Sequence, residues 1–167
     1  MTEITKTKSK MNPGTKQEKK SSKYPRHSLK ILKGNFAAAE GAKLCRTGFI
    51  PSYPITPQTT IVEELSAMVG RGEIDATYIN MDSEHSVFAA AMGAAMAGER
   101  VFTATSGQGL FYSHEVLHAI AHFRLPIVIC NVGRPSIPWN IWSDQSDSMS
   151  QRDTGWIQFY VKVRKKY

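Results

Sequence analysis

The pattern of apolar and polar positions predicts four helices in the chain from residue 35 onward. The clearest of them carries apolar side chains at the spacing of one helix face, namely Ile61, Val62, Leu65, Met68 and Val69. Alanine and glycine dominate two others and leave little side-chain bulk on their surfaces. The predicted helices cover residues 35–46, 58–69, 84–96 and a stretch from the turn at 106–109 to about residue 123.

Short strands are predicted between these helices. The first strand begins at residue 49, and three others cover residues 77–81, 100–105 and 126–132. A further strand is predicted over residues 155–161. The stretch 126–132 is the most apolar, which favours a central strand buried on both faces. Because strands alternate with helices, we expect βαβ units, a parallel sheet and therefore an α/β fold.

The turns that follow the predicted strands carry conspicuous polar, glycine or proline residues. These turns are 53–57, 82–84, 105–109 and 133–135. Right-handed crossovers place them at one edge of a parallel sheet. Ligands of open α/β sheets usually bind outside the carboxyl ends of the strands. The sequence therefore predicts a site at this edge.

The turn at 53–57 belongs to a stretch with three prolines in eight residues, Ile50-Pro51-Ser52-Tyr53-Pro54-Ile55-Thr56-Pro57. Proline lacks the amide hydrogen that helix interiors and central strands need, so neither is expected to contain this stretch. We expect a short strand that leaves the sheet through a rigid turn. Such a turn either forms part of a site or is only a stiff connection.

Glu84 is the most interesting titratable residue in the chain. It follows a predicted strand, lies in the first turn of a helix, and is preceded by Asp82 and Ser83, which can cap that helix. One interpretation is a carboxylate stabilised by the helix dipole, an effect worth about 0.3–1 kcal/mol. The other is a functional carboxyl in the site predicted at this edge.

Charge is distributed unevenly along the 167 residues. The chain carries a formal net charge of +7, but residues 1–33 hold ten Lys or Arg against two Glu, and residues 162–167 hold four basic residues. The remaining residues, 34–161, hold seven basic and twelve acidic side chains. We expect residues 1–30 and 162–167 to be basic tails, and 31–161 to be one partial domain. No apolar run is long enough for a membrane span.

Several common kinds of site find no support in the sequence. The P-loop pattern is absent, and the turn at 106–109 does not complete a dinucleotide-binding fingerprint. Cys45 and Cys130 lie far apart without a Cys-x-x-Cys pair, so they predict buried thiols rather than zinc or iron–sulfur ligands. Three histidines, at 114, 118 and 122, share one predicted helix face, where a surface or packing role is preferred over metal binding.

Residues 136–151 form a long stretch without a regular pattern. It contains Trp139 and Trp142 and then a run rich in serine and aspartate. Long irregular segments of compact domains are frequently functional, so we expect a functional loop or an interface.

Taken together, six segments resemble the first domain of the α subunit of pyruvate:ferredoxin oxidoreductases and related 2-oxoacid:ferredoxin oxidoreductases. They cover roughly residues 31–160 in the order of that family. The segments are Tyr53-Pro54-Ile55-Thr56-Pro57, Ser83-Glu84-His85-Ser86, the run from Phe102 to Leu110, His114-Glu115-Val116-Leu117, Asn140-Ile141-Trp142-Ser143-Asp144 and Arg152-Asp153-Thr154-Gly155-Trp156. The run Pro138-Trp139-Asn140-Ile141-Trp142 looks more like the pyruvate branch than the 2-oxoglutarate branch.

The resemblance implies a pyrimidine-binding domain of the thiamine diphosphate type. This fold is a three-layer open parallel sheet with helices on both faces, here incomplete at the C-terminus. The implied cofactor residues are Pro54, Thr56 and Glu84, with Glu84 as the catalytic carboxyl at the aminopyrimidine. Thr56 and Arg134 are implied to bind the substrate, with Arg134 at the 2-oxoacid carboxylate.

The resemblance also implies a cytoplasmic enzyme with several subunits. It performs oxidative decarboxylation of a 2-oxoacid with coenzyme A and with ferredoxin as electron acceptor. A β subunit would complete the thiamine site beside γ and δ type subunits, and Mg²⁺ and iron–sulfur clusters would lie on partner subunits. Because α subunits of the family are much longer, we expect a truncated chain that is inactive alone.

Two alternatives differ in class from an enzyme subunit. The chain could be a truncated, non-catalytic interaction module. Such a module would not bind thiamine diphosphate, even with a partner subunit present. A nucleic-acid-binding protein led by the basic tail is the other alternative. It is disfavoured because residues 34–161 are net acidic.

Overall fold

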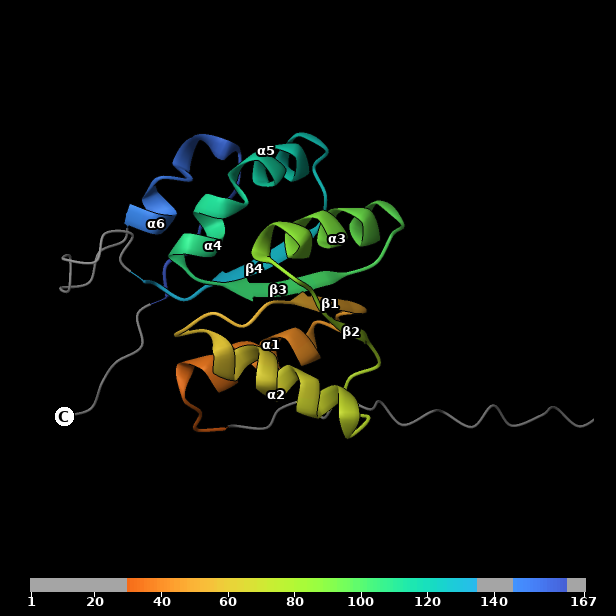
Figure 1. The fold of residues 1–167 in the computed structure, drawn as a ribbon. Helices are drawn as coiled ribbons and strands as arrows, with labels where there is room; N and C mark the ends of the chain where they lie inside the picture. The colour runs from red at the N-terminus through yellow and green to blue at the C-terminus, as the bar shows by residue number, and fades with distance from the viewer. Residues whose placement is uncertain (1–29, 135–145, 162–167) are drawn as a thin grey trace, which may run out of the picture.

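The structure, a computed structural model, describes residues 30–134 and 146–161. Within them, a parallel sheet lies between two layers of helices (Figure 1). The strands are β1 (Phe49–Ser52), β2 (Thr77–Asn80), β3 (Val101–Thr105) and β4 (Ile127–Asn131), in the spatial order β2-β1-β3-β4. The predicted three-layer α/β fold with a parallel sheet is therefore confirmed.

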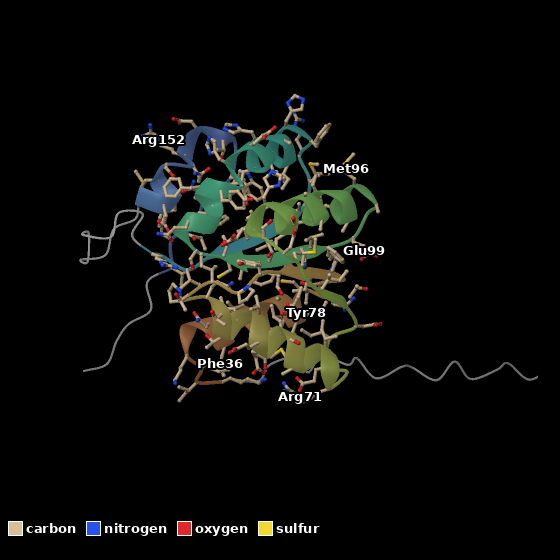
Figure 2. The ribbon with its side chains drawn as sticks, in the orientation of Figure 1. Phe36, Arg71, Tyr78, Met96, Glu99 and Arg152 are labelled. Carbon is tan, nitrogen blue, oxygen red and sulfur yellow. The ribbon has the colours of Figure 1, made fainter. Side chains whose placement is uncertain are left out.

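Each face of the sheet is covered by its own helices. Helices α1 (Gly34–Leu44) and α2 (Thr59–Gly70) lie on one face, and α3 (Glu84–Met96), α4 (Gly107–Tyr112) and α5 (His114–His122) lie on the other. The short helix α6 (Ser146–Met149) packs against α4, and a 3₁₀ turn (Arg152–Thr154) packs against α5. In Figure 2, Phe36 and Arg71 accordingly lie on the opposite side of the molecule from Met96 and Arg152.

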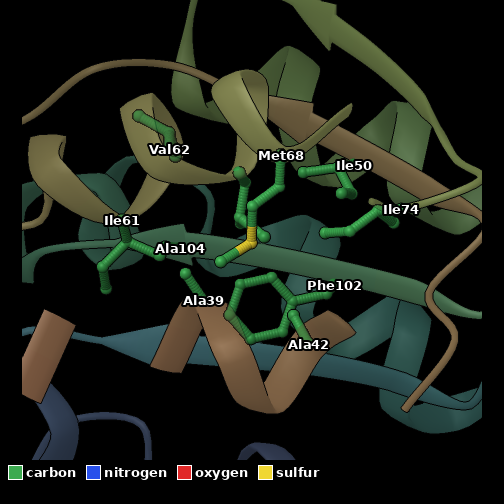
Figure 3. Packing of buried hydrophobic residues seen from close by; sticks show 10 residues of the cluster. Ala39, Ala42, Ile50, Ile61, Val62, Met68, Ile74, Phe102 and Ala104 are labelled. Atoms are coloured by element: carbon green, nitrogen blue, oxygen red, sulfur yellow. The ribbon is translucent and has the colours of Figure 1, made fainter. Parts of the chain in front are cut away.

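Two apolar clusters hold the layers together. The first lies between the sheet and α1 and α2 (Figure 3) and comprises Ala39, Ala42, Ile50, Ile61, Val62, Leu65, Met68, Ile74, Phe102 and Ala104. The second lies under α3, α4 and α5 and comprises Phe88, Ala91, Ala95, Val101, Leu110, Val116, Leu117, Ile120 and Ile127. The helical spacing of residues 61, 62, 65 and 68 thus marks the buried face of α2, as predicted.

The expectation that proline avoids an interior strand is wrong at Pro51. It lies within β1, which has β2 on one side and β3 on the other. The ladder between β1 and β3 has one register pair, Phe49 with Val101, whereas β1 and β2 pair along four residues. Beyond that pair, the Thr103 hydroxyl donates to the Pro51 carbonyl at 2.8 Å. A side-chain hydrogen bond to the proline carbonyl therefore joins the two strands beyond their single register pair.

The prediction that residues 126–132 form the central strand is wrong for the described part of the sheet. There β4 is an edge strand, and Val128 is 61% exposed. The strand buried at every position is β3, although it contains Thr103 and Thr105. The most apolar stretch is not the most buried strand, because hydrogen bonds to backbone oxygens allow threonine to occupy interior positions of β3.

Three further expectations need correction. The helix predicted up to residue 123 divides into α4 and α5 at Ser113, whose backbone is not helical. Residues 155–161 contain no strand, because no strand of the described residues pairs with them, and Ile157 and Phe159 remain more than 80% exposed.

Cys45 is exposed at the end of α1 rather than buried. Cys130 is half-buried, and burial raises the pKa of its thiol.

Candidate functional site at the carboxyl edge of the sheet

The site lies where the order of the strands reverses direction. From β1 the chain passes through α2 to β2 on one side, then returns through α3 to β3 on the other side. The crevice beyond the carboxyl ends of the strands at such a reversal is the usual ligand site of open α/β sheets. Here it is bordered by the turn after β1, the start of α3 and the turn after β3 (Figure 1).

Hydrogen bonds from α1 and from the residue that precedes α2 fix the turn after β1. The Gln58 side chain, fully buried, donates from Nε2 to the Tyr53 carbonyl at 2.8 Å, and its backbone amide donates to the Ile55 carbonyl at 3.0 Å. Asn35 Nδ2 in α1 donates to the Pro57 carbonyl at 3.0 Å. Pro54 and Thr56 nevertheless remain exposed, so the turn presents two of the predicted site residues at its surface.

Arg134 meets this turn from the far side of the sheet. Its Nη1 donates to the Thr56 carbonyl oxygen at 3.2 Å, although the two residues are 78 positions apart in the chain. The structure therefore brings together Thr56 and Arg134, as their shared edge predicts. The contact uses the backbone oxygen of Thr56 and not its hydroxyl.

Glu84 is the first residue of α3. Ser83 caps this helix as predicted, because its hydroxyl accepts a hydrogen bond from the Ser86 amide at 3.2 Å. The Ser86 hydroxyl, together with backbone amides of Asp82 and Ser83, lowers the pKa of the Asp82 carboxyl. Glu84 itself is half-buried, and none of the described basic side chains forms an ion pair with it.

Gly109 allows α4 to lie directly against Glu84. A Cβ atom at Gly109 would be 2.8 Å from Glu84 Cγ and would also collide with Thr105 Oγ1. The side chain of Glu84 is thus held between the start of its own helix and the backbone of α4. The structure joins Glu84 to the turn at 105–109, which the sequence analysis placed at the same edge.

Asp147 lies in the stretch predicted to be functional but was not among the predicted site residues, and its side chain lies at the other end of the site. Asp147 is 1% exposed, and its Oδ2 accepts from Asn131 Nδ2 at 2.7 Å and from the Arg134 amide at 3.4 Å. Its Oδ1 accepts from the Ser148 amide at 2.7 Å. Gly107 leaves room for this contact, since a Cβ there would lie 2.6 Å from the Arg134 carbonyl oxygen and 2.8 Å from Asp147 Cβ.

Polar atoms without protein partners lie at the ends of β3 and β4. Ser106 is fully buried, and neither its hydroxyl nor the Asn131 side-chain oxygen has a hydrogen-bond partner among the residues that the structure describes. Buried polar atoms normally have partners. These two atoms instead lie unpaired at the carboxyl edge within the described part of the chain.

The three histidines of α5 are exposed rather than packed in the core. His114 Nδ1 lies 2.7 Å from Gln151 Oε1, and its Nε2 lies 3.2 Å from His118 Nε2. No group of three histidine, cysteine, aspartate or glutamate side chains in residues 30–134 and 146–161 is placed to hold a metal ion. Trp139, Trp142 and residues 140–144 of the resemblance lie outside the described residues, as do most of both basic tails.

None of the helices in the described parts of the chain is both long and apolar enough to cross a membrane.

Comparison with known proteins decides the family. A family model described as the thiamine diphosphate-binding domain of pyruvate flavodoxin/ferredoxin oxidoreductase matches residues 40–165. The chain belongs to this family. The family match includes all the described residues of the carboxyl edge that are named above, from Pro54 to Asp147.

Curated relatives of the oxidoreductase domain are subunits of two kinds of enzyme. Ketoisovalerate oxidoreductase subunit VorA of Pyrococcus horikoshii is 53% identical over 134 residues, which are 80% of this chain and 34% of that protein. Pyruvate synthase subunit PorA of Methanothermobacter thermautotrophicus is 53% identical over 135 residues, or 80% of this chain and 35% of that protein. The chain thus spans about a third of the length of these relatives.

A solved structure supports the fold of this oxidoreductase domain. The 2-oxoglutarate:ferredoxin oxidoreductase from Magnetococcus marinus, with 2-oxoglutarate, coenzyme A and succinyl-CoA bound, matches with a TM-score of 0.60 and 28% identity. The match covers 64% of this chain and 18% of that one. Equal identity to a VorA and a PorA subunit does not separate the pyruvate branch from the ketoisovalerate branch, so the choice of pyruvate stays a prediction.

Proposed function

We propose that this chain is part of the α-type subunit of a 2-oxoacid:ferredoxin oxidoreductase and forms the wall of a thiamine diphosphate site that contacts the aminopyrimidine. One observation carries the proposal. Glu84 lies half-buried at a strand-order reversal, pressed against Gly109, and the described basic side chains leave its carboxyl unpaired. The family match to a thiamine diphosphate-binding domain supports a role for that carboxyl at the cofactor.

The residues of the carboxyl edge fit this cofactor. A carboxyl fixed beside a helix N-terminus can hold a proton between its oxygen and a ring nitrogen of the aminopyrimidine. The close approach at Gly109 leaves no room for a side chain there, so the position of the Glu84 stem is set by backbone. When bound, thiamine diphosphate supplies the nucleophilic carbon and the electron sink that decarboxylation of a 2-oxoacid requires.

Arg134 and Thr56 are the proposed residues for the substrate carboxylate. Arg134 is half-buried and donates one of its five N–H groups to the Thr56 carbonyl. Its other donors can pair with a carboxylate, and charge-assisted pairs of this kind are among the stronger hydrogen bonds in proteins. The exposed hydroxyl of Thr56 and the ring of Pro54 would border the same space.

The complete reaction needs partners. We place the diphosphate half of the cofactor, its Mg²⁺ and the iron–sulfur clusters on β, γ and δ type subunits, with ferredoxin as the acceptor and coenzyme A as the acyl carrier. The names of the relatives as subunits support a multi-subunit enzyme. Pyruvate is the proposed substrate, and the ketoisovalerate relatives make a branched 2-oxoacid the nearest competitor. Comparing kcat/KM for pyruvate, ketoisovalerate and 2-oxoglutarate in the assembled enzyme decides among them.

The proposal is tested by Glu84→Gln in the chain assembled with its partner subunits. Loss of the proton-holding carboxyl should lower kcat by about 10²–10⁴-fold, the usual range for acid–base groups, without changing the melting temperature. Glu115→Gln is the matched control, because Glu115 is also in the first turn of a helix but is exposed. Near-wild-type turnover in Glu84→Gln would contradict the role of Glu84.

A binding measurement separates the enzyme subunit from a non-catalytic interaction module. Calorimetric titration of thiamine diphosphate into the wild-type chain with its β partner should give saturable binding, and Glu84→Gln should weaken it. Absence of binding even with the partner present would favour the interaction module.

A further inference from the structure

Asp147 is a buried carboxylate at which four segments of the site meet. It lies in α6, it binds the side chain of Asn131 at the end of β4, and it accepts from the backbone amide of Arg134. The fourth segment is the first turn of α4, where Gly107 allows close contact with both Asp147 and Arg134. None of these contacts involves the residues assigned above to cofactor binding.

The surroundings of this carboxylate are unusual because its donors are neutral. Within residues 30–134 and 146–161, the donors are the Asn131 amide group and the backbone amides of Arg134 and Ser148, and none of the described basic side chains forms an ion pair with it. A buried carboxylate that loses a donor is strongly destabilised, so it holds its donors in place. Asp147 therefore constrains the backbone at Arg134.

A chain of hydrogen bonds attaches Asp147 to the rest of the fold. The Ser150 hydroxyl donates to the Asp147 carbonyl at 2.7 Å, and Gln151 Nε2 donates to the Ser150 hydroxyl at 3.0 Å. Gln151 Oε1 in turn lies 2.7 Å from His114 Nδ1 in α5. Gln151 is 4% exposed, whereas Ser150 and His114 are exposed, so the chain of bonds runs partly through the interior. The segment that carries Asp147 is thus anchored to a helix of the main core.

Arg134 is held at both of its ends. Its backbone amide faces Asp147, and its guanidinium donates to the Thr56 carbonyl. We infer that Asp147 is a positioning residue, which fixes the backbone of Arg134 and thereby sets the affinity of the enzyme for the carboxylate of its 2-oxoacid substrate. This inference rests on the proposed role of Arg134 as the group that pairs with that carboxylate.

Asp147→Asn is the sharpest variant for this inference, since it keeps the volume of the side chain but turns one acceptor oxygen into a donor. That new NH₂ group must face either the Ser148 amide or the Asn131 and Arg134 donors. The control is Asp75→Asn, because Asp75 is exposed in the loop before β2, away from the carboxyl edge.

The assembled enzyme is assayed with pyruvate, and KM and kcat are measured separately. Asp147→Asn should raise KM about tenfold, the effect of losing one hydrogen bond to a charged group, with a much smaller change in kcat. Arg134→Gln should raise KM further, and the double variant should equal Arg134→Gln alone, because Asp147 acts through Arg134. Asp75→Asn should behave as wild type.

Hydrogen–deuterium exchange provides a second readout that does not depend on turnover. The Arg134 amide should exchange faster in Asp147→Asn, while amides of α2 should be unchanged. Unchanged exchange at Arg134, or KM effects of the two variants that simply multiply, would overturn the inference. A parallel fall in kcat and melting temperature with KM unchanged would also overturn it in favour of a purely structural role.

These outcomes separate the inference from the proposed function. A wild-type complex that oxidises none of the three 2-oxoacids would overturn the proposed function, and the inference falls with it. Wild-type turnover with an unchanged KM in Asp147→Asn would overturn the inference alone.

Discussion

The apolar cluster beneath α1 and α2 and the junction around Asp147 are both buried, but they are built from different materials. The cluster consists of apolar side chains, and Leu65 and Ile50 at its centre are fully buried. The junction consists of a carboxylate, an amide, backbone N–H groups and a glycine that lets them approach. The cluster is held by the amount of apolar surface removed from water, and the junction is held by directional bonds.

This difference predicts how each region responds to change. In the cluster, a substitution should cost stability according to the volume it removes, with little effect on ligands. At the carboxyl edge, a change of a single atom can alter geometry while leaving most of the stability intact. Within one small domain, the apolar cluster therefore mainly determines stability, and the carboxyl edge mainly determines ligand binding.

The largest expected effect on stability is that of Leu65→Ala. Removing this fully buried side chain should lower the free energy of unfolding by about 2–5 kcal/mol, because a cavity remains among its neighbours. Urea unfolding followed by circular dichroism measures the loss, with Ser66→Ala, exposed on the same helix, as control. A loss below about 1 kcal/mol would show that the cluster is not the stabilising region.

Gly109→Ala should lower stability by less than Leu65→Ala does, but it should also weaken ligand binding. The added Cβ would lie 2.8 Å from Glu84 Cγ, so overpacking of about 1–3 kcal/mol is expected together with a displaced Glu84 and weaker thiamine diphosphate binding. Gly93→Ala in α3 is the matched control. It meets no atom within 4 Å and should stabilise the helix by about 0.5–1 kcal/mol. Equal behaviour of the two variants would contradict the close approach at Gly109.

Thr103→Val tests the bond between β1 and β3. The substitution keeps the shape of the side chain but removes the hydroxyl that donates to the Pro51 carbonyl, so a loss of about 1 kcal/mol is expected. Thermal unfolding measures it, with Thr77→Val, exposed on the edge strand β2, as the comparison. Identical melting temperatures for the two variants would mean that the hydroxyl contributes nothing.

The smallest expected effect is that of Glu73→Gln on the outer surface of the α1–α2 layer. Lys43 at 2.6 Å and Arg71 at 2.5 Å lower the pKa of Glu73 from 4.5 to about 2. A carboxyl with a lowered pKa stabilises the fold above the pKa of the unfolded chain and loses that contribution as the pH falls. Because Glu73 is a third exposed, the loss in Glu73→Gln should be below about 1 kcal/mol at pH 7.

The pH dependence sharpens this last comparison. The difference in unfolding free energy between wild type and Glu73→Gln should be constant from pH 7 to about 5 and should shrink as the pH falls from 4.5 toward 2. Urea titrations at several pH values measure it. A difference that grows as the pH falls would contradict the ion pairs.

The sequence was sufficient for features that repeat along the chain. Helical spacing predicted the buried face of α2, and the alternation of strands and helices predicted a parallel sheet whose turns share one edge. That shared edge is why the sequence alone places Thr56 and Arg134 near each other. The capping serine at position 83 was likewise a local signal.

Features that depend on partners distant in sequence could not be predicted. Nothing near Pro51 reveals that the Thr103 hydroxyl bonds its carbonyl, and the apolar run in β4 does not show whether a strand lies beside it. Asp147 lies in a stretch that was predicted only as a functional loop or an interface, and its burial among donors from other segments had no local signal. A polar residue inside a protein is determined by donors that arrive from other segments, and no periodicity encodes them.

The hydrogen bond from Arg134 to Thr56 also bears on the order in which the molecule assembles. It joins two residues that are 78 positions apart, whereas each βαβ unit closes over much shorter stretches. Contacts between distant residues form late, since a long segment must be ordered before they repay its lost freedom. During synthesis from the N-terminus, α1 and α2 can pack before Arg134 has left the ribosome, so the carboxyl edge matures after the core that carries it.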